Sequence, residues 1–135
     1  MTNCTRAVTL SAVLSFAAVT LQGCVQPEPT PEEIAELRER GEVTELQTLA
    51  EQGNAVAQVT LGLMYFEGDG VEQDDAEAVR WYQLAVAQGD AAGQYNLGVM
   101  YAEGRGVPQD DAEAVRWFRL AAAQRNARTG IRLLS

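Results

Sequence analysis

The sequence predicts an all-α fold in which antiparallel helix pairs stack into a solenoid. Residues 67–82, EGDGVEQDDAEAVRWY, return as EGRGVPQDDAEAVRWF at 103–118. The segments 54–89 and 90–125 that contain them are identical at 23 of 36 positions. A period of roughly 20 to 50 residues is typical of solenoids, because each unit buries its apolar face against the next unit.

Each unit divides into two helices. Apolar residues recur at helical spacing, and alanine, a strong helix former, is abundant in both segments. The first helix is expected at residues 55–66 and again at 91–102, and the second at 75–88 and again at 111–124. The sequence therefore predicts one helical hairpin that occurs twice.

Turn and cap residues separate the two helices of each unit. Glycine accepts a positive φ at little cost and commonly ends a helix. Four glycines take this place in the two copies: Gly68, Gly70, Gly104 and Gly106. Asp74 lies three residues before Glu77, which is the spacing of a capping box, and Asp110 repeats this arrangement with Glu113. We therefore expect each aspartate to begin a second helix, where an acid also suits the positive end of the helix dipole.

The largest and smallest residues indicate how the helices pack. Trp81 and Trp117 provide large apolar surfaces and are expected to lie between neighbouring hairpins. Gly62 and Gly98 lie inside the first helix of each copy, where glycine costs about 1 kcal/mol relative to alanine. We expect close approach of the paired helix, through small residues such as Ala85 or Ala121, to offset that cost.

Partial copies flank the two full units. Residues 32–53 are expected to form an atypical opening helix pair, and Pro31 suits a first helical position. Residues 126–135 align with the start of a unit and are expected to form a partial capping helix. Terminal repeats typically differ from internal ones. The repeat domain is thus predicted to extend over residues 32–135.

The repeated elements resemble a known family. The stretches LGLMYFEGDGV and LGVMYAEGRGV, each followed by DDAEAVRW and an alanine-rich helix, are similar to Sel1-like repeats of the tetratricopeptide-like superfamily. The 36-residue period and the glycine-x-glycine-valine turn match this family, and the resemblance extends over about residues 40–135. It implies a right-handed superhelix of antiparallel helix pairs that acts as a protein-interaction adaptor.

The segment before the repeats is predicted to be a processing signal. Arg6 and the amino terminus precede fifteen apolar or small residues, 7–21, which suit the n-region and h-region of an export signal and are short for a membrane span. The following LQGC resembles the lipobox of bacterial lipoproteins, which implies that residues 1–23 are removed and Cys24 is acylated. Ordinary secretory cleavage and an uncleaved anchor are the alternatives.

The residues around Cys24 indicate how the chain would be anchored. Cys4 would leave with the signal, so Cys24 would be the one remaining thiol, unable to form an internal disulfide. Residues 24–31 are rich in proline and polar residues, which predicts an extended tether. By resemblance to lipoprotein sorting, Val25 after the cysteine favours a periplasm-facing position on the outer membrane.

Residue types that commonly catalyse reactions or bind metals are scarce. The chain has 19 acidic residues, no histidine and no lysine, and its formal net charge is -9. This composition excludes a serine or cysteine triad and a zinc site built from cysteine and histidine, and it argues against a nucleic-acid partner. An EF-hand alignment on Gly70 places Tyr65 and Ala76 at two ligand positions, so calcium is not expected either. We expect no catalytic residue, no metal, and no cofactor besides the lipid on Cys24.

Positions that differ between the two copies are candidates for partner binding. Those on or beside one stripe of the first helices are Val59, Leu63, Phe66, Tyr95, Asn96 and Val99. In related superhelices the first helices line the concave face, so this stripe is the predicted binding surface. The alternative is that these residues fill gaps between repeats.

The predicted function is that of a non-enzymatic adaptor that holds an unidentified protein or peptide at the cell envelope. A secreted or host-facing interaction factor and an envelope hydrolase are the alternatives.

After Glu113 every charged residue of the chain is an arginine. They indicate either a solvated end of the stack or a docking patch for an acidic partner or lipid headgroups. Self-association through Ile131 and Leu134 is a further possibility.

Overall fold

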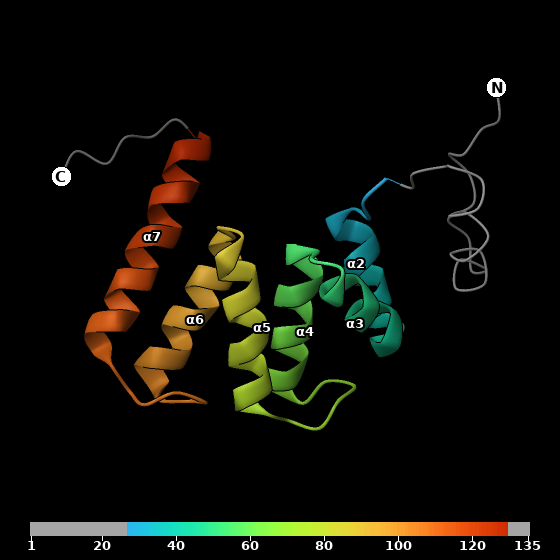
Figure 1. Ribbon diagram of the computed structural model, residues 1–135, viewed down its shortest axis with the longest axis horizontal. Coiled ribbons are helices and arrows are strands. Elements are labelled where there is room, and N and C mark those ends of the chain that lie inside the picture. Colours follow the sequence, from blue (N-terminus) through green and yellow to red (C-terminus); the bar gives the residue numbers. More distant parts are fainter. Residues whose placement is uncertain (1–26, 130–135) are drawn as a thin grey trace. The chain divides into compact units, whose positions relative to one another are not determined.

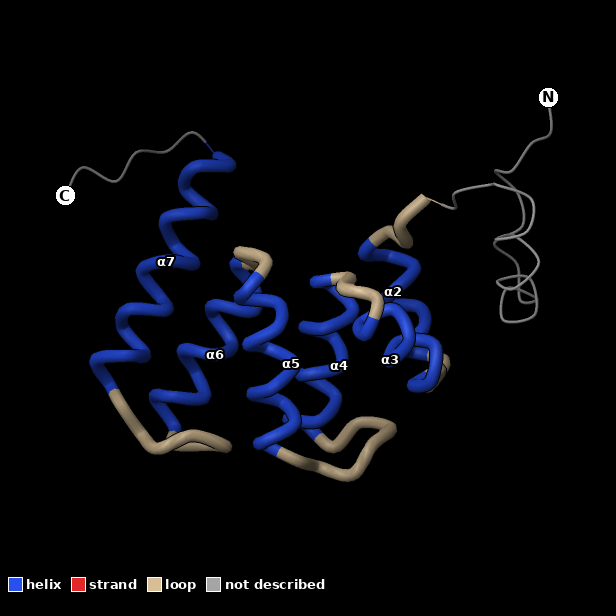
Figure 2. The backbone as a smooth tube through the Cα atoms, viewed as in Figure 1, coloured by secondary structure: helices blue, strands red, loops and turns tan. Residues whose placement is uncertain are grey.

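The computed structural model describes residues 27–129 of the chain (Figure 1). All of the described helices lie in the unit that begins at residue 31. Within residues 27–129 every regular element is a helix and none is a strand (Figure 2). The helices are α2 (Pro31–Glu39), α3 (Val43–Glu51), α4 (Ala55–Glu67), α5 (Asp75–Ala87), α6 (Ala91–Glu103) and α7 (Asp111–Thr129).

Several predicted features lie outside the described residues. These are the export signal at 1–23, the acylated Cys24, and the apolar residues Ile131 and Leu134. Residues 27–30 of the predicted tether contain no regular element, and α2 begins at Pro31. Among the described helices, none combines the length and apolar character that crossing a membrane requires.

The helices of the unit form an all-α helical repeat. Each helix contacts the next one along the chain, and α4 also contacts α2 and α6 across the intervening helix. α2 and α3 occupy the segment where the sequence predicts an opening pair, and α4–α5 and α6–α7 are the two repeated hairpins. Each pair can therefore shield one apolar face only by packing against its neighbour.

The turn between the paired helices follows the sequence prediction. Gly68 follows the last residue of α4 and has a φ of 72°, and Gly104 follows the last residue of α6 and has a φ of 66°. The Asp74 carboxylate accepts hydrogen bonds from the backbone N–H groups of Ala76 and Glu77 at 3.0 and 3.1 Å. The same two bonds recur at Asp110 in the second copy.

Only half of the expected capping box forms. In a full box the side chain of Glu77 would accept from the backbone N–H of Asp74. That N–H instead donates to the carbonyl of Tyr65 at 3.0 Å. The Glu77 carboxylate accepts from Arg80 one turn later on α5. The aspartate therefore caps the helix alone, and its backbone ties the turn to α4.

Two apolar clusters form the core, and each joins successive helix pairs. The first contains residues of α2 through α5: Ile34, Leu46, Ala50, Ala57, Leu61, Met64 and Trp81. The second contains residues of α5 and α6: Ala78, Val79, Tyr82, Leu97 and Met100. Trp81 is 2% exposed, and Trp117 is half-buried and packs against the second cluster. Both tryptophans lie between layers, as predicted.

The neighbours of the mid-helix glycines differ from the prediction. A Cβ atom on Gly62 would stand 2.5 Å from Cε1 of Tyr82, and one on Gly98 would stand 2.8 Å from Cε1 of Phe118. The close neighbour is thus an aromatic ring and not a small residue. Ala85 instead approaches Gly93, where a Cβ would lie 2.9 Å from its own Cβ. Glycine at position 62 leaves room for a ring against the α4 backbone.

The expectation that a separate helix begins at residue 126 is wrong. α7 continues without a break from Asp111 to Thr129. In the preceding unit the chain turns at Gly89, whose φ is 78°. Arg125 takes the equivalent position in the last unit and lacks the conformational freedom of glycine. The helix therefore passes through the point where a hairpin turn would otherwise occur.

We expect Gly62→Ala to lower the free energy of unfolding by about 1–3 kcal/mol, because the added methyl group overpacks against the Tyr82 ring. Urea denaturation followed by circular dichroism measures this change. Helix propensity alone predicts the opposite sign, a gain of about 1 kcal/mol. A stabilised Gly62→Ala variant would therefore contradict the packing shown by the structure.

Candidate protein-binding groove

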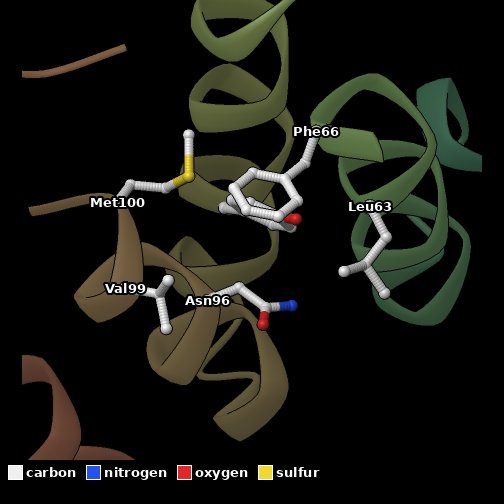
Figure 3. A pocket seen from close by; sticks show the side chains of 6 residues that line it. Leu63, Phe66, Asn96, Val99 and Met100 are labelled. Carbon is white, nitrogen blue, oxygen red and sulfur yellow. The ribbon is translucent and has the colours of Figure 1, made fainter. Parts of the chain in front are cut away.

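Four of the six predicted partner-binding residues line one hollow on the surface. Leu63 and Phe66 come from α4, and Asn96 and Val99 come from α6 (Figure 3). Met100 of α6 and Tyr82 of α5 complete the lining, and we call this hollow the α4–α6 groove. Residues three apart on a helix lie on the same face, so each helix presents two of the four side chains together.

The size of the groove limits what it can hold. Its volume is ≈ 40 Å³. Pockets that bind small molecules typically enclose about 300–1,000 Å³. The groove therefore has room for the end of one side chain and not for a metabolite.

The other two predicted residues lie elsewhere. Val59 of α4 is 8% exposed, so it belongs to the buried core and is not available to a partner. Tyr95 is 56% exposed, and its ring centroid lies 5.4 Å from that of Phe118 on α7. Val59 is therefore a core residue, and Tyr95 lies at the α6–α7 contact.

Tyr82 gives the groove an uncharged, buried wall. The residue is 1% exposed. Burial raises the pKa of Tyr82 well above its usual range, and the nearby charge of Glu67 raises it further. The hydroxyl group therefore stays uncharged, and the buried ring supports the groove from behind without being accessible to a partner.

Arg105 holds the rim of the groove in place. Its guanidinium donates to the two carboxylate oxygens of Asp75 at 3.0 and 2.6 Å. It also donates to the Phe66 carbonyl at 3.2 Å and lies 3.8 Å from the centroid of the Phe66 ring. A bidentate arginine–carboxylate pair is a directional contact, so it fixes both the turn and the aromatic ring.

Sequence reasoning missed the role of Arg105. Position 105 lies between the two turn glycines and is occupied by Asp69 in the first copy. Asp69 pairs with Arg38 of α2 at 3.1 Å. Both copies carry a charged residue at this position, although the two charges have opposite sign. This is the sequence signal that each turn forms an ion pair with a preceding helix.

Within residues 27–129 no group of three or more histidine, cysteine, aspartate or glutamate side chains is arranged to hold a metal ion.

Comparisons with known proteins agree with this architecture. The family model described as Sel1 repeat matches residues 55–90 and 91–126, which starts each unit one residue later than the sequence alignment does. A search of curated proteins found no match.

Two of the crystal structures to which the chain is similar represent this fold. The first is a Sel1 repeat protein from Oxalobacter formigenes, with 33% identity and a TM-score of 0.64, covering 87% of this chain and 97% of that one. The second is c5321, described as a protective antigen present in uropathogenic Escherichia coli strains displaying an SLR fold, with 38% identity and a TM-score of 0.64. That match covers 86% of this chain and 26% of c5321, so the chain spans about a quarter of its length. The chain belongs to the Sel1 repeat family, whose members are generally non-enzymatic scaffolds for protein–protein interaction.

Proposed function

We propose that this protein is a lipid-anchored adaptor of the bacterial cell envelope, which holds a segment of a partner protein in the α4–α6 groove. The observation that supports the groove is its lining, in which half-buried apolar side chains of two successive repeats surround one amide group. An apolar anchor residue in a small, well-packed recess is the typical energetic centre of a protein interface.

The chemistry of the groove favours a particular kind of segment. Leu63, Phe66 and Val99 accept an aliphatic or aromatic side chain. The Asn96 amide has both donors and an acceptor, so it suits the backbone of a bound peptide. The net charge of -9 attracts basic partners over a longer range. The expected partner segment therefore has an apolar anchor flanked by basic residues.

The lipid anchor is supported by the sequence LQGC, which ends at Cys24. Each methylene group of an acyl chain contributes about 0.8 kcal/mol to membrane binding, so several chains hold a protein firmly. The adaptor would be tethered by residues 24–31 and would face the periplasm from the outer membrane.

Replacing Val99 by Glu is expected to reduce partner capture about tenfold or more, because it places a charge at a contact that must lose water. Capture from envelope extracts on the immobilised chain, quantified by mass spectrometry, measures this loss. Leu84→Glu is the matched control, since Leu84 is an exposed apolar residue of α5 that does not line the groove. Undiminished capture by a Val99→Glu variant with unchanged helicity would contradict the proposed site.

Metabolic labelling with a radioactive fatty acid tests the anchor. Label is expected on the wild-type chain and on Cys4→Ser, and its complete loss is expected on Cys24→Ser, because only the thiol of Cys24 follows the lipobox-like sequence. Label that persists on Cys24→Ser would show that this cysteine is not the acylation site.

A secreted or host-facing interaction factor of the same fold is a second candidate. The similarity to c5321, a protective antigen of pathogenic strains, favours it. Absence of fatty-acid label together with recovery of the chain from the culture medium would support this alternative over the anchored adaptor.

A further inference from the structure

The last helix pair exposes apolar positions that are buried one repeat earlier. Val79 of α5 is 6% exposed and lies against Gly106 of the α6–α7 turn, whereas Val115 of α7, 36 residues later, is 46% exposed. Val59 of α4 is 8% exposed, whereas Tyr95 of α6, again 36 residues later, is 56% exposed. Both helices of the last pair therefore contribute to one uncovered apolar surface.

An aromatic pair lies within this surface. Phe118 of α7 is half-buried, whereas the equivalent Tyr82 of α5 is 1% exposed. The ring centroids of Phe118 and Tyr95 lie 5.4 Å apart, so the pair joins α6 to α7. We call Tyr95, Val115 and Phe118 the open face. Exposed apolar surface marks interaction sites, and aromatic side chains are enriched at the centre of protein interfaces.

Charged residues on α7 are placed symmetrically about Phe118. Asp111 lies seven residues before Phe118, and Arg125 lies seven residues after it. Seven residues are close to two helical turns, so the three side chains lie on one face of α7 with the two charged positions about 21 Å apart. Both charged side chains are exposed, and Asp111 forms no ion pair with a described residue.

The two ends of the α6–α7 pair carry opposite charge. Three exposed acids lie at the end that contains the turn: Glu103, Asp110 and Asp111. The arginines near this turn are already paired with acids. At the other end Arg125 and Arg128 are exposed, and the acid there, Asp90, is half-buried and caps α6. A second copy that lies antiparallel on the first therefore meets opposite charge at both ends, whereas a parallel copy meets like charge.

We propose that the open face binds the open face of a second copy, so that the chain forms a two-fold symmetric dimer. α7 of one copy lies antiparallel to α7 of the other, and the Tyr95–Phe118 pairs of the two copies meet at the two-fold axis. Asp111 of each copy then pairs with Arg125 of the other. Because both copies use the same surface, the contact closes at a dimer.

Side-chain size fits the same arrangement. Val115 lies three residues before Phe118, and Ala122 lies four residues after it. In the antiparallel arrangement Val115 of one copy faces Ala122 of the other. A larger side chain therefore meets a smaller one on each side of the aromatic centre, which lets the two helices pack closely.

The dimer leaves the partner site of each copy in place. None of the three open-face residues lines the α4–α6 groove. A dimer therefore carries two grooves, and a partner with two suitable segments gains affinity by binding both of them.

Sedimentation equilibrium of the purified chain tests this proposal, in a reducing buffer that excludes dimers linked by disulfides. A monomer–dimer equilibrium that goes no further is expected. Asp111→Arg and Arg125→Asp, tested separately, are each expected to lower the association constant about tenfold or more, because each puts like charges in contact at both ends of the interface. An equimolar mixture of the two variants is expected to recover the dimer, because each of its contacts then joins opposite charges.

A second pair of variants separates the contact from folding. Val115→Asp is expected to weaken the dimer, whereas Leu120→Asp is expected to leave it unchanged. The two side chains are similarly exposed, at 46% and 41%, but a spacing of five residues places them on different faces of α7. Circular dichroism of each variant checks its helicity. A chain that stays monomeric at millimolar concentration, association that continues beyond the dimer, or a mixture of folded charge variants that does not recover the dimer would overturn the proposal.

Discussion

Burial of one helix pair against the next is the interaction on which the rest of the structure depends. Trp81 of α5 joins the same apolar cluster as Ile34 of α2 and Leu46 of α3, so this cluster connects the α4–α5 pair to the α2–α3 pair. Full burial of a large apolar side chain contributes about 1.5–3 kcal/mol, and no pair obtains it alone. Hydrogen bonds continue the connection, since Gln88 donates to Gln58, which itself donates to the Ala50 carbonyl.

The groove is a consequence of this stacking. Glycine at position 62 lets the Tyr82 ring lie against α4, and the same ring forms the buried wall of the α4–α6 groove. The ion pair between Arg105 and Asp75 fastens the second turn to the preceding pair and at the same time holds the Phe66 ring. Residues that join the repeats therefore also shape the surface offered to a partner.

Local signals in the sequence were sufficient for the two repeated hairpins, their turn glycines and the capping aspartates, but not for Glu77 or for the end of α7. Gly68 and Asp74 act through bonds to residues nearby in the chain, so their roles follow from spacing alone. The neighbour of Gly62 depends on how one helix is rotated against another, which spacing does not determine, and Ala85 was the wrong expectation. Four groove residues were predicted by comparing the two copies, whereas the burial of Val59 and the contacts of Arg105 required the three-dimensional arrangement.

Native-state hydrogen exchange, resolved by helix, tests the central claim most directly. If stability comes from contacts between neighbouring pairs, a helix covered on both sides opens less often than one covered on a single side. The amides of α4 and α5 are then expected to exchange most slowly, and those of α2 and of residues 120–128 most rapidly. Equal protection along all the helices, or slower exchange in residues 120–128 than in α5, would contradict the account.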